Sequence, residues 1–330
     1  MSQRIVTLTL NPALDLAAEA TEVVPTHKIR MHQGHADPGG GGVNVSRVLH
    51  ELGGDTLAIV AAGGASGRVL EELLDEAGVR RRSVPIQGQT RISLNVQDLR
   101  HDLEYRFVPE GPQLSTAEFA ACLAAVEQEP GEWLIASGSL PPGAPVDAYA
   151  QVARVAARKS QRYVVDTSGP PLAAVLEQGG CTLVKPSLTE LEYLVGRELK
   201  DPDEQDSEAL ALVRRGAARM VAVTLGAEGA LLATEAGVLR LRALDEAMHS
   251  SVGAGDAFVA AATLALARGG TPADALVWGS AAGAAAIACA GTARLRRADV
   301  AMRHQVLTAR EGAGARPQSS SALRLAASAA

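Results

Sequence analysis

The chain has 330 residues, 31 Lys and Arg against 37 Asp and Glu, and a formal net charge of −6 at pH 7. This length provides an ample hydrophobic core in one large or two smaller domains, and mild acidity argues against a nucleic-acid-binding protein, which needs a basic face. Three cysteines far apart predict neither a disulfide framework nor a metal cluster, so a reducing, cytoplasmic setting is expected.

No apolar segment predicts a leader or a membrane span. The first apolar run, residues 5–10, is short, so we expect no signal peptide. The alanine-rich stretch 281–290 is too short and too weakly apolar to cross a bilayer. Residues 311–330, rich in serine and alanine, are expected to be a disordered tail.

In chain order, residues 5–10 predict a strand, 42–52 a helix, 57–60 a strand and 69–77 a helix. Further strands are expected at 133–135, 163–165, 182–184 and 221–224, with helical patterns between them. This alternation predicts an α/β fold with a doubly wound, mostly parallel sheet, in which ligands bind at the carboxyl ends of the strands. Asn11, Asp166, Lys185 and Thr224 lie just where predicted strands end.

Two segments, 28–35 and 91–108, have strand-like alternation with no helix between the strands. We interpret them as a small β-sheet inserted into the α/β body, acting as a lid. The alternative is ordinary edge strands. The expected organisation is one domain over 1–310, with lid segments at about 14–38 and 90–110.

The most informative motif is S-S-V-G-A-G-D at 250–256, followed by an apolar helical run. A Gly-Ala-Gly turn entering a helix leaves backbone N–H groups free to hold an anion. Asp256 beside that anion hole can accept a proton from an attacking hydroxyl, which is the minimal machinery for phosphoryl transfer. The alternative is an aspartate that only complements the helix dipole.

Two motifs near the N-terminus indicate a sugar site. Four consecutive glycines, 39–42, precede Asn44 and allow a ligand to lie against the main chain; the alternative is a flexible loop. No Gly-Lys-Ser/Thr follows, so this is not a Walker A loop. In N-P-A-L-D at 11–15, the Asp15 carboxylate can bind vicinal hydroxyls, or it can be an ordinary turn residue.

Two later motifs are candidates for a nucleotide site. In L-V-K-P-S-L-T-E at 183–190, Ser187 and Glu190 match a helix capping box. The functional alternative places Lys185 and Glu190 near a triphosphate and its Mg²⁺. The segment T-L-G-A-E-G at 224–229 is either a simple turn or a close backbone approach to a nucleotide.

Taken in order, these motifs and S-G-S-L-P-P-G at 137–143 resemble the ribokinase-like, phosphofructokinase-B family of carbohydrate kinases over about residues 5–305. The all-glycine loop 39–42 and E-Y-R-F-V-P at 104–109 are most similar to the 6-phosphofructokinase branch. The resemblance implies a ribokinase-like, Rossmann-type fold with a β-sheet lid and a homodimer joined through the lids. It implies ATP-dependent phosphorylation of fructose 6-phosphate at the C1 hydroxyl, giving fructose 1,6-bisphosphate.

The resemblance also implies roles for individual residues. Asp256 would be the general base, and Gly253, Ala254 and Gly255 would form the anion hole. The sugar phosphate would be bound by Asp15, Lys28, Gly40, Gly41, Asn44, Arg91 and Ser139. ATP would be bound by Lys185, Ser187, Thr224, Gly226, Ala227 and Gly229, with Glu190 organising Mg²⁺ through water. A K⁺ site would use carbonyls of Ser250, Val252, Ala286 and Gly291.

Ser187 stands where the family usually has asparagine, which predicts a weaker Mg-ATP network. The alternatives within the family are a 1-phosphofructokinase, a tagatose-6-phosphate kinase, and a nucleoside or unphosphorylated-sugar kinase. A different class is a non-catalytic sugar-phosphate sensor. Asp256 argues against the sensor, because a binding protein needs no base.

Only four of the 31 basic residues are lysines. We expect Lys159 and Lys200 to be ordinary solvated charges. Lys28 and Lys185 are predicted to contact phosphate groups, for which a compact ammonium on a flexible stem is better suited than a planar guanidinium.

Overall fold

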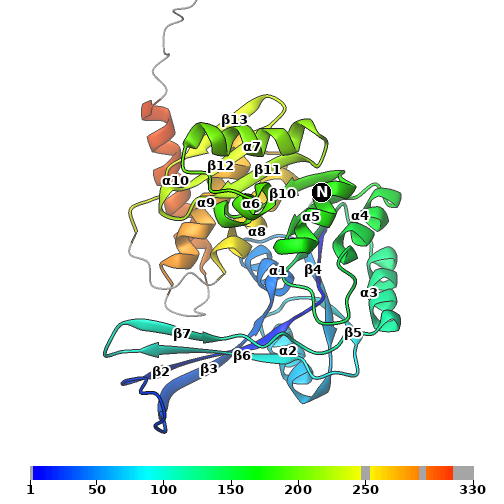
Figure 1. The fold of residues 1–330 in the computed structure, drawn as a ribbon, viewed down its shortest axis with the longest axis vertical. Coiled ribbons are helices and arrows are strands. Elements are labelled where there is room, and N and C mark those ends of the chain that lie inside the picture. Colours follow the sequence, from blue (N-terminus) through cyan, green and yellow to red (C-terminus); the bar gives the residue numbers. More distant parts are fainter. Residues whose placement is uncertain (1–2, 247–252, 290–294, 315–330) are drawn as a thin grey trace, which may run out of the picture.

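The computed structural model describes residues 3–246, 253–289 and 295–314. It contains a nine-stranded sheet in the order β13-β12-β11-β10-β9-β8-β1-β4-β5 and a four-stranded sheet in the order β3-β2-β6-β7, which projects from the body (Figure 1). The strands are β1 (Ile5–Thr9), β2 (Ala13–Ala20), β3 (Met31–Gly39), β4 (Thr56–Ala62), β5 (Arg81–Pro85), β6 (Arg91–Asp98), β7 (Leu103–Phe107), β8 (Trp133–Ser137), β9 (Arg162–Asp166), β10 (Cys181–Val184), β11 (Ala218–Thr224), β12 (Ala230–Thr234) and β13 (Gly237–Leu241). The helices are α1 (Gly41–Glu51), α2 (Gly64–Glu76), α3 (Thr116–Gln128), α4 (Ala148–Arg158), α5 (Gly169–Gln178), α6 (Leu188–Val195), α7 (Pro202–Arg214), α8 (Ala254–Ala267), α9 (Pro272–Ile287) and α10 (Arg297–Gly314), with a 3₁₀ turn, η1 (Gly226–Glu228).

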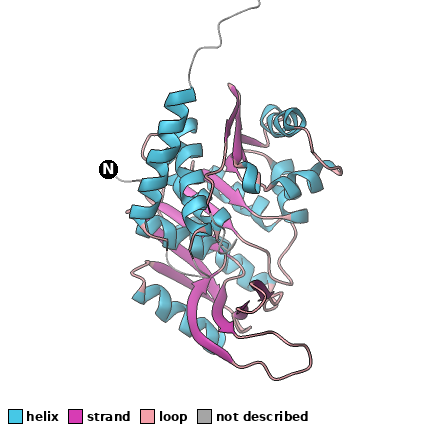
Figure 2. Ribbon diagram, turned by 90° about the vertical axis from the view of Figure 1, so that its left-hand side faces the viewer, coloured by secondary structure: helices cyan, strands magenta, loops and turns pink. Residues whose placement is uncertain are grey.

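Side-chain alternation along the central strands explains the layered body. In β8, Leu134 packs into the core shared with α3 to α7, whereas Trp133 and Ile135 pack into the core shared with α1, α8, α9 and α10. Successive residues of a strand point to opposite faces, so both faces of this buried sheet are apolar. Figure 2 shows helices on both sides of the large sheet. The predicted doubly wound α/β fold is confirmed, although the antiparallel edge formed by β12 and β13 was not predicted.

The four-stranded sheet consists of the two segments that were predicted to form an insertion. β2 pairs with β6 in parallel register, and β3 and β7 pair antiparallel to them on either side. None of these strands joins the large sheet, so they are not its edge strands. The register aligns Asp15 with Ser93, and Asn95 with Arg106, which places these polar side chains on one face.

Two expectations need correction. α10 extends to Gly314, four residues into the predicted tail, and residues 315–330 lie outside the described chain. Lys159 is not a solvated charge, because its Nζ donates to the carbonyl oxygens of Val126 and Glu129, 2.7 and 2.5 Å away, at the C-terminal end of α3. Lys200 is exposed beside Glu198, as expected. Across the described residues, no helix combines the length and apolarity that a membrane span requires.

Candidate active site

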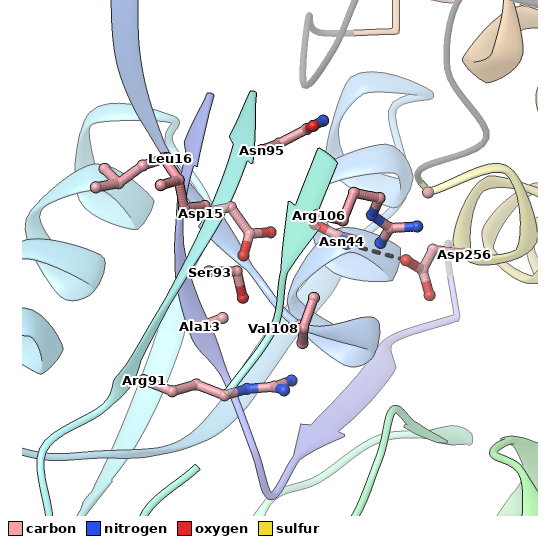
Figure 3. Close-up of a pocket in the computed structure, with 13 residues that line it drawn as sticks. Ala13, Asp15, Leu16, Asn44, Arg91, Ser93, Asn95, Arg106, Val108 and Asp256 are labelled. Carbon is pink, nitrogen blue, oxygen red and sulfur yellow. Dashed lines mark hydrogen bonds between the residues drawn. The ribbon is translucent and has the colours of Figure 1, made fainter. Parts of the chain in front are cut away.

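A pocket of about 180 Å³ lies between the four-stranded sheet and the N-terminal ends of α1 and α8 (Figure 3). It brings together residues that are far apart in the sequence. Its lining consists of Ala13, Asp15, Leu16, Gly40, Asn44, Arg91, Ser93, Leu94, Asn95, Arg106, Val108, Gly253 and Asp256. Six of the predicted site residues are among them, which are Asp15, Gly40, Asn44, Arg91, Gly253 and Asp256.

Asp256 lies in the first turn of α8, behind an N-cap glycine. Gly253 adopts φ 74°, a left-handed conformation that favours glycine. The Asp256 carboxylate accepts hydrogen bonds from Asn44 Nδ2 at 2.9 Å and from Ser137 Oγ at 3.5 Å. Asp256 is therefore not the N-cap, and it is tied to residues of α1 and β8 instead.

The environment of Asp256 raises its pKa to about 7. Burial is the largest cause, because a carboxylate loses hydration there, and repulsion by the carboxylate of Asp166 adds to it. The hydrogen bonds from Asn44 and Ser137 and the charge of Lys185 act in the opposite direction. A pKa near neutrality suits a group that must accept a proton from a hydroxyl.

The N-terminus of α8 presents donors beside this carboxylate. In the described chain, the first N–H that bonds within the helix is that of Ala257, which donates to the carbonyl oxygen of Gly253 at 2.8 Å. Among the described residues, the preceding amides, from Gly253 to Asp256, have no hydrogen-bond partner, as is usual for the first N–H groups of a helix. Amides at the N-terminus of a helix can hold an anion, and these lie directly next to the Asp256 carboxylate.

The glycine run is closely packed rather than a flexible loop. An added Cβ at Gly39 would overlap the carboxylate of Asp15, and one at Gly41 would overlap Ser137 Oγ. Gly40 is the N-cap of α1 with φ 100°, where an L-residue is strained. The glycines therefore allow the small sheet, α1 and β8 to approach each other closely, and Asn44 in the first turn of α1 faces Asp256.

The small sheet contributes one carboxylate and two guanidiniums to the pocket. Burial raises the pKa of Asp15, while a hydrogen bond from Ser93 and the charge of Arg91 partly offset it. Arg91 donates to the carbonyl oxygens of Pro109 and Asn11 at 3.0 and 3.1 Å, and its buried Nε has no partner among the described residues. Figure 3 shows the Arg106 side chain directed toward Asn44 and Asp256. This wall suits an anionic ligand that also carries hydroxyl groups.

Lys185 and Asp166 form a buried ion pair at the ends of β10 and β9, with Nζ and Oδ1 3.2 Å apart. Burial alone would lower the pKa of Lys185, but the carboxylates of Asp166 and Glu190 outweigh it and the net pKa is raised. Lys185 is therefore charged at neutral pH. Gly255 lies against it, because an added Cβ there would be 3.3 Å from Nζ. This pair links the strand ends to the N-terminus of α8.

The two candidate nucleotide segments lie side by side. Ser187 and Glu190 form the predicted capping box of α6: Ser187 N donates to Glu190 Oε2 at 2.7 Å, and Glu190 N donates to Ser187 Oγ at 3.2 Å. Thr224 N donates to the Pro186 carbonyl oxygen at 3.1 Å. Gly226 and Gly229 have positive φ in the β11–β12 turn, and Ala227 lies between them in η1. The turn and capping interpretations are thus confirmed, and both segments adjoin the Lys185 pair.

Other predicted residues lie elsewhere. Lys28 is in the exposed loop between β2 and β3 and does not line the pocket. Ser139 Oγ accepts a hydrogen bond from Asn11 Nδ2 at 3.2 Å, just outside the lining. Ala286 is in α9, and its carbonyl oxygen accepts from Cys289 N at 3.1 Å. Ser250, Val252 and Gly291 lie outside the described residues.

No role was predicted for Asp166, Ser93, Asn95 or Arg106. The polar alternation of β6, in which Arg91, Ser93 and Asn95 share a face, was the signal available for two of them. Arg106 required the β6–β7 register, which aligns it with Asn95. Asp166 required the pairing of β9 with β10, which places it beside Lys185.

Comparison with known proteins agrees with this geometry. The model of the pfkB family of carbohydrate kinases matches residues 8–298. The chain is 44% identical over 299 residues to the ATP-dependent 6-phosphofructokinase isozyme 2 of Mycobacterium tuberculosis, covering 90% of this chain and 88% of that protein. It is 34% identical over 271 residues to a 1-phosphofructokinase of Xanthomonas campestris, covering 81% and 85% of the two chains.

A crystal structure of Escherichia coli phosphofructokinase-2 with fructose-6-phosphate superimposes with a TM-score of 0.87 at 38% identity, covering 93% of this chain and 99% of that one. Other structures of the same E. coli enzyme contain potassium or show a tetrameric inhibited form. Both the family match and the identity extend over nearly the whole catalytic fold. The chain therefore belongs to the pfkB family of carbohydrate kinases.

Proposed function

We propose that the protein transfers the γ-phosphoryl group of ATP to the C1 hydroxyl of fructose 6-phosphate. The observation that carries the proposal is Asp256, with a pKa of about 7, beside the N-terminal amides of α8 in a pocket whose other wall holds Arg91 and Arg106. A base, an anion hole and a cationic grip are the three groups that phosphorylation of a sugar phosphate requires. Similarity to 6-phosphofructokinases adds support.

In this mechanism, Asp15 and Asn44 bind sugar hydroxyls and orient the C1 oxygen toward Asp256. Asp256 accepts the hydroxyl proton as the C1 oxygen attacks the phosphorus atom of the γ-phosphoryl group. The amides of Gly253, Ala254 and Gly255 stabilise the negative charge of the transferred group, because fixed donors need no reorganisation during the reaction. ADP leaves with the electron pair of the broken P–O bond.

The remaining predicted residues are assigned to the nucleotide. Lys185, Ser187 and Thr224 would contact ATP, with the backbone at Gly226, Ala227 and Gly229 close to it. Mg²⁺ bound to the ATP phosphates would neutralise their charge. The residues fit this metal, because Glu190 and Asp166 are carboxylates close enough to Lys185 to influence its pKa. The described residues contain no group of three or more His, Cys, Asp or Glu that could form a complete metal cage. A metal held mainly by phosphates and water needs no such cage.

We further propose that the four-stranded sheet is the lid and that a homodimer forms through it. The face opposite Asp15 and Arg106 exposes apolar side chains, including Ile92 and Phe107. Exposed apolar patches of this kind mark interaction surfaces. Light scattering should give twice the chain mass, and Phe107→Lys should shift it toward the monomer; a native monomer, or no shift in the variant, would contradict this interface.

The substrate assay compares ADP release with fructose 6-phosphate, fructose 1-phosphate and tagatose 6-phosphate. The highest kcat/KM with fructose 6-phosphate, and phosphorylation at C1 by ³¹P NMR, are expected. A preference for fructose 1-phosphate would instead support the second candidate, a 1-phosphofructokinase, which the Xanthomonas relative favours. Binding of a sugar phosphate without turnover of any of the three would indicate a sensor.

A further inference from the structure

A second cavity, of about 310 Å³, lies where the C-terminal ends of α1 and α8 meet α9 and α10. The residues of α8 and its C-cap that line this cavity, from Ala261 to Arg268, follow Asp256 by 5 to 12 residues, so the cavity lies about 8 to 18 Å from Asp256 along the helix axis. Its walls include the buried side chains of Leu52 and Leu264 and the half-buried ring of Trp278. None of the residues assigned to sugar or nucleotide lines it.

Two arginines converge on the cavity. An added Cβ at Gly53 would lie 3.6 Å from Arg297 Nη1 and 3.8 Å from Arg268 Nη2, so both guanidiniums approach one point. Burial and then the charge of Arg297 lower the pKa of Arg268. Two cations held this close repel each other, and a shared anion would relieve that repulsion.

Neither charge is neutralised within the described part of the chain. Arg268 Nη2 donates to the carbonyl oxygens of Leu52 and Gly53 at 3.0 and 3.2 Å, which are neutral acceptors. Arg268 and Arg297 are both exposed, and the Arg297 guanidinium has no ion pair or hydrogen bond to a described residue, although the Arg297 backbone N–H donates to Glu51 Oε1 at 2.9 Å. The one lining carboxylate, Asp274, uses its Oδ2 to accept from Thr271 N and Oγ1 in the capping box of α9.

We infer that this cavity binds a small organic anion, with a phosphate or carboxylate group bridging Arg268 and Arg297. Guanidiniums present paired donors that match both groups. The apolar wall indicates a compact apolar or aromatic body packed against Leu264 and the Trp278 ring. That ring is held by stacking on His304, with centroids 3.9 Å apart and planes at 24°, so the wall is preformed.

Phenyl phosphate is the probe, and the indole N–H resonance of Trp278 is the readout in ¹⁵N-labelled full-length protein. The chain has two tryptophans, and Trp278→Phe identifies the signal by its loss. Phenyl phosphate should shift this resonance saturably. Arg297→Gln should raise the Kd about tenfold or more, the loss of one charge-assisted contact. Arg296 is adjacent to Arg297 and equally classed as exposed, but it does not line the cavity, so Arg296→Gln should leave the Kd unchanged.

Further ligands and a stability control make the outcomes distinct. Benzoate should shift the same resonance, whereas inorganic phosphate and benzyl alcohol should each need at least tenfold higher concentration. Equal unfolding midpoints for the two arginine variants would show that both are folded. The inference is overturned if phenyl phosphate leaves the Trp278 resonance in place, if Arg297→Gln binds like the parent, or if inorganic phosphate binds equally well. Phenyl phosphate bound only at the active site would leave this resonance unshifted.

Discussion

Replacing Asn44 with alanine should move the pH dependence of turnover. Asn44 Nδ2 donates to Asp256 Oδ2 at 2.9 Å, and this bond stabilises the charged carboxylate. A hydrogen bond to a charged group contributes about 1.5–3 kcal/mol, and one pKa unit corresponds to about 1.4 kcal/mol. Loss of the bond should therefore raise the pKa of Asp256 by about one unit or more, from about 7 toward 8.

The direction of the change in kcat/KM follows from the proposed role of Asp256 as the base. Asp256 must be deprotonated to accept a proton, so kcat/KM rises with pH through its pKa. At pH 7 the active fraction should fall from about a half to about a tenth, a loss of about fivefold that disappears at pH 9. Removal of a sugar contact would add a loss that is the same at every pH. The two contributions are therefore separable in one titration.

The measurement is kcat/KM for fructose 6-phosphate between pH 5.5 and 9.5, with ADP release coupled to an excess of indicator enzymes. Asn95→Ala is the matched control, because Asn95 lines the same pocket but donates to Glu104 rather than to Asp256. For Asn95→Ala, kcat/KM should fall on the acid side at the same pH as in the parent. An Asn44→Ala profile that keeps the parental acid limb would refute the proposed tuning of Asp256.

Asp256→Asn should keep ATP binding, measured by calorimetry, and lose turnover by about 10²–10⁴-fold. The raised pKa of Asp256 means that the parent loses stability as the pH rises above the ordinary pKa of aspartate. The melting temperature of Asp256→Asn should therefore exceed that of the parent by more at pH 8 than at pH 4. Arg91→Ala should raise the KM for fructose 6-phosphate with little change for ATP, because Arg91 lines the pocket, and an unchanged KM would remove Arg91 from the sugar site. Gly41→Ala should lower the melting temperature and the activity together, since its Cβ has no space against β8, and a variant as stable as the parent would contradict this packing. Lys185→Arg should raise the KM for ATP, because a larger guanidinium cannot fit beneath α8, whereas parental kinetics would show that the ammonium is not required.

The sequence predicted the body of the fold because its signals are local. The apolar runs of β1, β8 and β9 and the polar alternation of β6 appear within a few residues. β12 and β13 were missed, since an antiparallel hairpin added to a parallel sheet depends on pairing with β11. Motif spacing identified Asp15, Asn44 and Asp256 as candidate site residues. That all three line one pocket depends on the packing of two sheets and two helices.

Other properties of the site required three-dimensional contacts. The four glycines could be a flexible loop on sequence alone, and only the neighbours of Gly39 and Gly41 show that close packing requires them. The pKa of Asp256 depends on Asp166, which is 90 residues away in the chain. For Lys28 the composition was misleading. Lysine is rare in this chain, and that rarity suggested a functional role for Lys28, but Lys28 lies in an exposed loop and does not line the pocket of its own chain.

The parallel course of α1 and α8 has a mechanical consequence. At one end the two helices are joined by the Asn44–Asp256 hydrogen bond, and at the other by the bonds from Arg268 to the carbonyl oxygens of Leu52 and Gly53. The two helices are therefore joined by hydrogen bonds at both ends, and side chains packed between them hold them at a fixed separation. We expect that weakening the bonds from Arg268 changes the separation of the two helices at the Asn44–Asp256 end. A substitution at Arg268 is therefore expected to change the pKa of the Asp256 carboxyl group, which lies about 18 Å away along the helix axis.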